Sequence, residues 1–280
     1  MPKSHHDKRP IPTPLPAATV TLLRDSDDGP EVLMLQRNFQ SGFMPGMYIF
    51  PGGALDPADA TAEAGALCRQ LDDAAASRLL GLERGGLAYW IAAIRESFEE
   101  AGILLACDAR GHPVALQDSD VMARFEAERA RLNAGEGDFA AFIAAEGLRL
   151  AVDQLVYFGH WITPVGAPRR YDTRFFIARA PAQQQPLHDD IETIAHVWVR
   201  PHAALAAHAR GEFSMRTPTV KTLESFARHA SVDELIAAMR ALQEIPAMLP
   251  RISRDGRRLL PGEPGYEEAA SAEGRGSWNL

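Results

Sequence analysis

The strongest hydrophobic pattern along the chain lies in residues 87–101. At about 100° of rotation per residue, four apolar side chains of this segment fall within a sector of roughly 60°. They are Leu87, Ile91, Ile94 and Phe98. Such a stripe predicts an amphipathic helix that is buried on one side. Gly102 follows the last turn and can end the helix, because glycine adopts the left-handed conformation without strain.

Short apolar runs rich in β-branched residues predict strands elsewhere in the chain. Residues 17–23 and 31–37 are two such runs, and the acidic turn between them predicts that they form a hairpin. The other runs with strand character are 103–106, 155–163, 173–178 and 194–199. Strands are therefore expected throughout the chain rather than in one block.

Alanine-rich and charged stretches between these strands predict helices. Residues 56–86 are expected to form one or two short helices, and residues 118–146 a small helical insertion. Closer to the carboxyl end, Pro201 is expected to open a helix. The capping box from Ser231 to Glu234 predicts the start of another.

Because strands and helices alternate, the chain is expected to have an α/β fold with a mixed β-sheet between helices. The main domain is expected to carry two helical insertions. The expected divisions are a flexible lead (1–16), the domain (17–245) with insertions at about 56–86 and 110–147 and a helical part at 201–245, and a tail with a hairpin (246–280).

The composition narrows the class of protein. The 280 residues carry 29 basic and 37 acidic side chains, a formal net charge of −8, which argues against a surface that coats nucleic acid. No apolar run is long enough to cross a bilayer, and the polar start lacks the apolar core of a secretory signal. Two cysteines fit a reducing compartment. We therefore expect a cytoplasmic protein that binds neither nucleic acid nor membrane.

The polar side of the predicted helix carries three carboxylates close together. Glu96, Glu99 and Glu100 project opposite the apolar stripe, at a spacing where like charges repel. They also lie at the helix end where the dipole disfavours negative charge. A cation would offset that cost, and clustered carboxylate oxygens suit Mg²⁺ or Mn²⁺. The pattern therefore predicts a divalent metal site.

Around these carboxylates the sequence resembles the Nudix hydrolase superfamily, whose motif reads G-x5-E-x7-R-E-U-x-E-E-x-G-U, with U apolar. The second half of the motif is matched by Arg95, Glu96, Glu99, Glu100, Gly102 and Ile103. Ser97 stands at its first apolar position. Gly53, which follows Phe50-Pro51-Gly52, matches its start. The resemblance implies a Nudix α/β/α sandwich with a mixed sheet and helical insertions.

The spacing within the motif departs from the standard one. Arg95 follows Gly53 by 42 positions, where the motif has 14, so 28 residues are inserted. Asp59 stands at the first acidic position, and Asp56, Asp59 and Glu63 are all candidates to pair with Arg95. A long-insert box with a Gly-Phe-Met-Pro-Gly stretch upstream is similar to the branch that contains the peroxisomal coenzyme A diphosphatases.

The resemblance also implies a reaction, the hydrolysis of the diphosphate bond in a nucleoside diphosphate linked to another group. Glu96, Glu99 and Glu100 would bind Mg²⁺ or Mn²⁺, and Arg95 would orient these carboxylates. The proton of the attacking water would pass to Glu192, just before a predicted strand, or to a glutamate of the box. Arg95, Glu99 and Glu192 are thus the expected catalytic residues.

Basic residues and glycines outside the helix are candidates for substrate binding. Arg170 and Arg174 carry guanidinium groups, which match phosphate oxygens in a bidentate manner, and similar strings occur in the same branch. Arg37 is a further candidate for a phosphate contact, with a surface position on its strand as the alternative, and Gly52 and Gly53 complete the expected set.

The long-insert branch implies that the substrate is coenzyme A or an acyl derivative, which would give 3′,5′-ADP and 4′-phosphopantetheine. The coenzyme A motif of the superfamily is matched only in part, with Asn38 and Gly42 as departures. The alternatives are an ADP-ribose or dinucleotide diphosphatase and a non-catalytic Nudix-fold ligand-binding protein. The expected partner is a small nucleotide-type molecule, and a homodimer is compatible with this picture.

Overall fold

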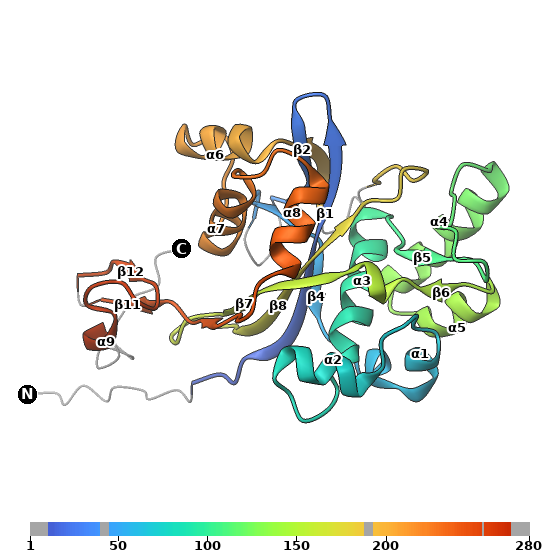
Figure 1. Cartoon of the computed structure of the whole chain (residues 1–280), viewed down its shortest axis with the longest axis horizontal. Helices are drawn as coiled ribbons and strands as arrows, with labels where there is room; N and C mark the ends of the chain where they lie inside the picture. The colour runs from blue at the N-terminus through green and yellow to red at the C-terminus, as the bar shows by residue number, and fades with distance from the viewer. Residues whose placement is uncertain (1–10, 40–44, 188–192, 254, 270–280) are drawn as a thin grey trace, which may run out of the picture.

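A computed structural model describes residues 11–39, 45–187, 193–253 and 255–269 of the chain. Figure 1 shows a twisted sheet through the middle of the molecule, with helices on either side of it. One apolar core lies between the sheet and helices α1 to α5, and a second lies between the sheet and helices α6 to α8. The expected α/β/α sandwich is confirmed.

The sheet is mixed. Its order is β10-β7-β8-β1-β2-β3, while β4 pairs with β1 and β9 pairs with β2. β1 runs parallel to β8 and β10 parallel to β7, and the other pairs are antiparallel. The strands are β1 (Leu15–Ser26), β2 (Gly29–Arg37), β3 (Tyr48–Ile49), β4 (Gly52–Ala54), β7 (Val156–Ile162), β8 (Tyr171–Arg179), β9 (Thr193–Val199) and β10 (Ala247–Met248).

The helices and the remaining short strands lie around this sheet. The helices are α1 (Ala62–Ala66), α2 (Asp73–Leu80), α3 (Leu87–Ala101), α4 (Ser119–Asn133), α5 (Phe139–Ala145), α6 (Pro201–Ala209), α7 (Thr217–Phe226), α8 (Val232–Arg240) and α9 (Tyr266–Ala269), with 3-10 turns η1 (Pro57–Ala60) and η2 (Val152–Gln154). Two small sheets pair β5 (Ala106–Cys107) with β6 (Arg149–Leu150), and β11 (Arg251–Ile252) with β12 (Arg258–Leu259).

α3 begins and ends where the hydrophobic period predicts. Its apolar stripe is at most 6% exposed, and Trp90 beside that stripe packs on Phe176 of β8 with ring centroids 4.7 Å apart. Gly102 ends the helix in the left-handed region at φ +67°, and its N–H donates to Phe98 O. Burial against the sheet therefore fixes which side of α3 remains polar.

Most expected elements are confirmed, and one is wrong. Both insertions are helical, since residues 56–86 hold η1, α1 and α2 and residues 118–146 hold α4 and α5. The predicted strand at 103–106 is reduced to its last residue, Ala106, which starts β5. The Gln184 side chain bonds both the N–H and the C=O of Leu104, so an amide from a distant segment takes the place of a neighbouring strand.

The part of the chain that the structure describes holds no helix with the length and hydropathy to span a membrane.

Candidate active site

Two glycines of β4 make close contacts, Gly52 with β1 and Gly53 with α3. β4 pairs with β1 through Gly52 and Gly53, and it packs against α3. A Cβ on Gly53 would lie 2.5 Å from Glu96 Oε1, and a Cβ on Gly52 would lie 2.5 Å from the backbone oxygen of Ala18. A side chain at Gly52 would therefore clash with the backbone of β1, and one at Gly53 would displace the Glu96 carboxylate.

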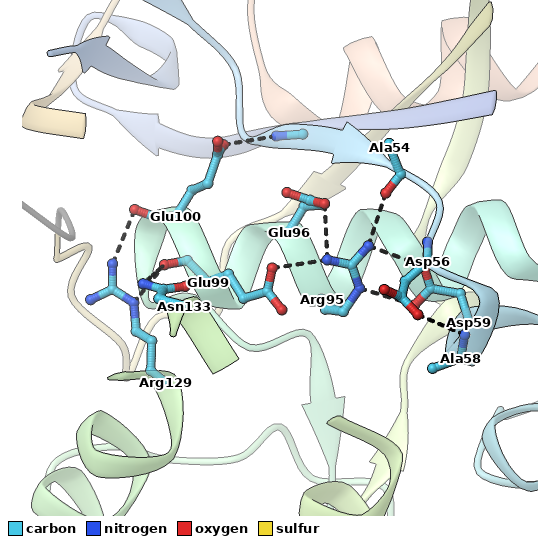
Figure 2. Close-up of polar contacts among 11 residues, drawn as sticks. Ala54, Asp56, Ala58, Asp59, Arg95, Glu96, Glu99, Glu100, Arg129 and Asn133 are labelled. Atoms are coloured by element: carbon cyan, nitrogen blue, oxygen red, sulfur yellow. Dashed lines mark hydrogen bonds and ion pairs between the residues drawn. The ribbon is translucent and has the colours of Figure 1, made fainter. Parts of the chain in front are cut away.

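Arg95 is the centre of the site, as Figure 2 shows. Its Nε and Nη2 donate to the two carboxylate oxygens of Asp59, each at 3.0 Å. Its Nη1 donates to Glu96 Oε1 and Glu99 Oε2, both at 2.9 Å, and Nη2 also donates to Ala54 O at 3.0 Å. One guanidinium thus ties the loop after β4 to the polar side of α3.

Asp59 is the acidic residue that pairs with Arg95, among the three candidates in the sequence. It is 3% exposed, and its second oxygen also accepts from Asp56 N at 2.8 Å. The side chain of Asp56 caps the first turn of η1, and Glu63 is exposed on α1. The long insertion therefore follows Asp59, and α1 and α2 lie between this residue and the start of α3.

Glu100 faces the glycine turn rather than Arg95. Its Oε2 accepts from Gly52 N at 3.0 Å, and the residue is only 6% exposed. A hydrogen bond from a backbone N–H to a carboxylate is stronger than one between neutral groups. The three helix carboxylates are thus held by two different groups, the Arg95 guanidinium and the Gly52 amide.

The site holds more negative than positive charge. Burial, together with the negative charges of Glu99 and Asp59, raises the pKa of Glu96 to about 7, because the positive charge of Arg95 offsets only part of these effects. Burial raises the pKa of Glu99 in the same way. Burial would lower the pKa of Arg95, but the carboxylates around it outweigh burial and raise it. One guanidinium therefore does not neutralise the cluster.

The donor set fits a divalent cation. Among the described residues no three carboxylate, imidazole or thiol side chains already converge as a metal site. Glu96 and Glu99 each place one oxygen on Arg95, and within the described residues their second oxygen makes no hydrogen bond. Hard oxygen donors with excess negative charge suit Mg²⁺ or Mn²⁺. Glu96, Glu99 and Glu100 are the residues that could hold such an ion.

Glu192 lies outside the described residues, so its expected role is untested. The residues on both sides of its segment are bonded to α3. Leu187 N donates to Ala101 O at 2.8 Å, and Thr193 Oγ1 donates to Glu100 O at 3.4 Å. Leu187 and Thr193 therefore both contact the end of the carboxylate helix.

Arg37 lies near the same helix end. It is the last residue of β2 and faces Thr193 of β9 in the sheet register. The Thr193 side chain in turn contacts the last turn of α3. The sheet thus brings Arg37 to the neighbourhood of the carboxylates, and its contact with phosphate stays a prediction.

Arg170 and Arg174 lie in different surroundings. Arg170 is 8% exposed and donates to two backbone carbonyls, at 3.0 and 3.1 Å. Arg174 is ion-paired with Asp172, which also lies 2.6 Å from His160 Nε2. Burial alone would raise the pKa of Asp172, but His160 and Arg174 outweigh it and hold the pKa below its usual value. The roles of both arginines in substrate binding stay predictions.

Two residues of the second insertion reach the site without any signal in the sequence. Arg129 and Asn133 of α4 donate to backbone carbonyls of the last turn of α3 (Figure 2). They belong to a charged, alanine-rich helix outside the motif, where a polar residue ordinarily indicates a solvated face. Only the tertiary structure identifies them.

Comparisons with known proteins agree with this geometry. The family model of the NUDT19 Nudix domain matches residues 72–225. Acyl-coenzyme A diphosphatase NUDT19 of Gallus gallus is 30% identical over 279 residues, which span 85% of this chain and 73% of that protein. The Homo sapiens protein of the same name is 29% identical, and the match spans 86% of this chain and 73% of that protein.

A solved structure supports the same assignment. The crystal structure of a NUDIX hydrolase from Alicyclobacillus acidocaldarius superposes with a TM-score of 0.68 at 28% identity. The superposition covers 84% of this chain and 99% of that one. The family match, the relatives and the shared fold lead to one conclusion: the chain belongs to the Nudix hydrolase family, in the branch defined by the NUDT19 Nudix domain.

Proposed function

We propose that this chain is a metal-dependent diphosphatase that hydrolyses coenzyme A or acyl-coenzyme A to 3′,5′-ADP and 4′-phosphopantetheine or its acyl derivative. The observation that supports it is the gathering of Glu96, Glu99 and Asp59 around one guanidinium, with Glu100 beside them on Gly52. The substrate is suggested by the curated relatives, which are named acyl-coenzyme A diphosphatases. The catalytic unit is proposed to be residues 17–245.

The proposed mechanism assigns a task to each group. Glu96, Glu99 and Glu100 would hold Mg²⁺ or Mn²⁺, which supplies Lewis acidity toward phosphoryl oxygens and water. Arg95 would fix the directions of Glu96 and Glu99 through its hydrogen bonds. Glu192, or Glu99 of the box, would accept the proton of the attacking water.

The substrate would be placed by groups that border the carboxylates. Gly52 and Gly53 place the β4 backbone beside the carboxylates, and their contact with a phosphate stays a prediction. Arg37 would contact a phosphate oxygen, and Arg170 and Arg174 are the further candidates from the sequence. A homodimer and a cytoplasmic location remain predictions from the sequence.

The test is a substrate panel with product identification by mass. The chain is incubated with coenzyme A, an acyl-coenzyme A, ADP-ribose and a dinucleoside polyphosphate at equal Mn²⁺ concentration. We expect 3′,5′-ADP as the main nucleotide product from the first two. In ¹⁸O-labelled water one oxygen joins one phosphorus and the bond to the bridging oxygen breaks, so the label appears in one of the two products.

Preferential turnover of ADP-ribose or of the dinucleotide would replace the substrate assignment and retain the diphosphatase. Turnover of none of the four, with or without Mn²⁺, would support a non-catalytic ligand-binding protein. The Glu99→Gln variant is the control for contaminating phosphatases, because its Arg95 contact can persist while a charged metal ligand is lost.

A further inference from the structure

The last turn of α3 ends in carbonyl groups that have no partner inside the helix. Each accepts a hydrogen bond from a residue that lies beyond the helix. Phe98 O accepts from Gly102 N, and Ala101 O accepts from Leu187 N. The two carbonyls between them belong to Glu99 and Glu100, and α4 supplies donors for both.

Arg129 is the main donor to this turn. Its Nε donates to Glu99 O at 2.8 Å, and its Nη2 donates to Glu100 O at 3.1 Å. The same Nη2 also donates to Leu187 O at 2.7 Å. Asn133, one turn further along α4, donates from Nδ2 to Glu99 O at 3.3 Å. Figure 2 shows both side chains reaching the end of α3.

The surroundings favour a fixed position for this arginine. Arg129 is 8% exposed, although arginine is mostly found on surfaces. Its charge lies at the carboxyl end of α3, where the helix dipole favours a cation. Because one planar group bonds two successive carbonyls, it fixes their backbone and thus the origin of both side chains.

We propose that Arg129 is a positioning residue for the metal-binding carboxylates, and that the second insertion serves the active site through it. This inference rests on the proposed function of Glu99 and Glu100 as metal ligands. Without Arg129 the two carbonyls would keep only the longer hydrogen bonds from Asn133 and Thr193, at 3.3 and 3.4 Å, so the last turn would loosen. Glu96 lies one turn earlier, where helical hydrogen bonds remain, so its position is expected to persist.

The competing explanation is that α4 only stabilises the fold, and the same helix offers a matched control. Arg124 bonds Glu146 of the segment after α5 at 2.9 Å through two donors, and it is more than half exposed. It belongs to the same helix and the same residue type but makes no described contact with α3. Arg124→Met therefore removes an arginine from α4 without touching the carboxylate turn.

The experiment measures Mn²⁺ binding by titration calorimetry, with substrate absent, in the full chain and its variants. Arg129→Met is expected to weaken Mn²⁺ binding about tenfold or more, the range for residues that orient metal ligands. Arg129→Lys, which keeps the charge but loses the fork of donors, is expected to recover part of that affinity. Asn133→Ala removes one long hydrogen bond and is expected to weaken binding about twofold, less than any Arg129 variant.

Amide hydrogen exchange of residues 99–104 provides a second readout. Arg129→Met is expected to raise exchange there, whereas Arg124→Met is expected to leave it and the Mn²⁺ affinity unchanged. Equal Mn²⁺ affinity in Arg129→Met and the unaltered chain, or equal losses in both arginine variants, would overturn the role of Arg129 alone. No Mn²⁺ binding by the unaltered chain would overturn the proposed function as well. If Arg129→Met does not fold, Arg129→Lys decides, because unchanged affinity in that variant contradicts the proposal.

Discussion

Two clusters of arginine and carboxylate lie on the α3 side of the sheet, and they differ in charge balance. Around Arg95, one guanidinium is shared by Asp59, Glu96 and Glu99. Around Asp172, one carboxylate is shared by Arg174 and His160. The pKa of Glu96 is raised to about 7, whereas the pKa of Asp172 is lowered.

The difference supports the proposal that the Arg95 cluster, and not the Asp172 cluster, takes up a cation. In the Asp172 cluster the carboxylate has its partners within the chain, so its charged form is already stabilised. In the Arg95 cluster the carboxylates outnumber the cation, and an added divalent ion would offset the excess. The presence of arginines and carboxylates in the sequence does not distinguish the two clusters. The ratio of carboxylates to cationic partners in the structure does.

The largest expected effect is the contrast between Glu99→Gln and Asp172→Asn. Glu99→Gln is expected to lower kcat/KM at least about 100-fold, because a charged group beside the reacting phosphate is lost. Asp172→Asn is expected to lower the melting temperature. It is expected to leave kcat/KM within about threefold of the unaltered chain, a change of less than about 1 kcal/mol in activation free energy. Steady-state kinetics on the preferred substrate measure both. The reverse order of effects would exchange the roles of the two clusters.

A smaller effect is expected at the acidic partner of Arg95. Asp59→Asn weakens the bidentate contact that holds the guanidinium, so the Mn²⁺ concentration for half-maximal activity is expected to rise about tenfold. Glu63→Gln changes an exposed carboxylate in the same insertion and is expected to leave that concentration unchanged. Equal effects of the two substitutions would remove Asp59 from the site.

The raised pKa of Glu96 predicts how the metal-free chain responds to pH. Between about pH 4.5 and 7 the unfolded chain loses this proton while the folded chain keeps it, so stability falls as the pH rises through this window. Glu96→Gln does not titrate. At pH 8 without metal it is expected to melt about 2–4 °C above the unaltered chain, equivalent to about 1 kcal/mol.

Calorimetric melts in a chelator from pH 4.5 to 8 check this prediction. The gap between Glu96→Gln and the unaltered chain is expected to open with rising pH and to be absent at the acidic end. A constant gap across the range would show that Glu96 titrates as an ordinary surface carboxylate.

The smallest catalytic effect is expected from Arg170→Met. Because Arg170 donates to two backbone carbonyls, its loss is expected to destabilise the chain by about 1–3 kcal/mol and to change KM by less than about twofold. Thermal melts and substrate titrations separate the two effects. A KM raised tenfold with an unchanged melting temperature would instead support the substrate contact that the sequence suggests.

The sequence predicts α3 well, because a 3.6-residue period defines the stripe from Leu87 to Phe98. Gly53 is expected only through the resemblance, and the structure adds that a Cβ there would lie 2.5 Å from Glu96 Oε1. The partner of Arg95 could not be chosen from the sequence. Asp56, Asp59 and Glu63 are separated by a few residues, and only the turn at η1 determines which one faces the guanidinium.

Contacts between distant segments could not be predicted. Gln184 replaces a strand partner of Leu104 across 80 positions, which is why the strand expected at 103–106 is mostly absent. Arg129 contacts Glu99 across 30 positions through backbone carbonyls, which carry no sequence information about their partners. Periodicity and motifs describe side chains on one element, and they do not describe what caps its end.

The most direct test of the metal site is a crystal structure of the chain grown with Mn²⁺, with anomalous scattering recorded at the manganese edge. We expect an anomalous peak within coordination distance of carboxylate oxygens from Glu96, Glu99 and Glu100. A crystal saturated with Mn²⁺ that shows no peak there, with Glu96 and Glu99 still on Arg95, would contradict this expectation.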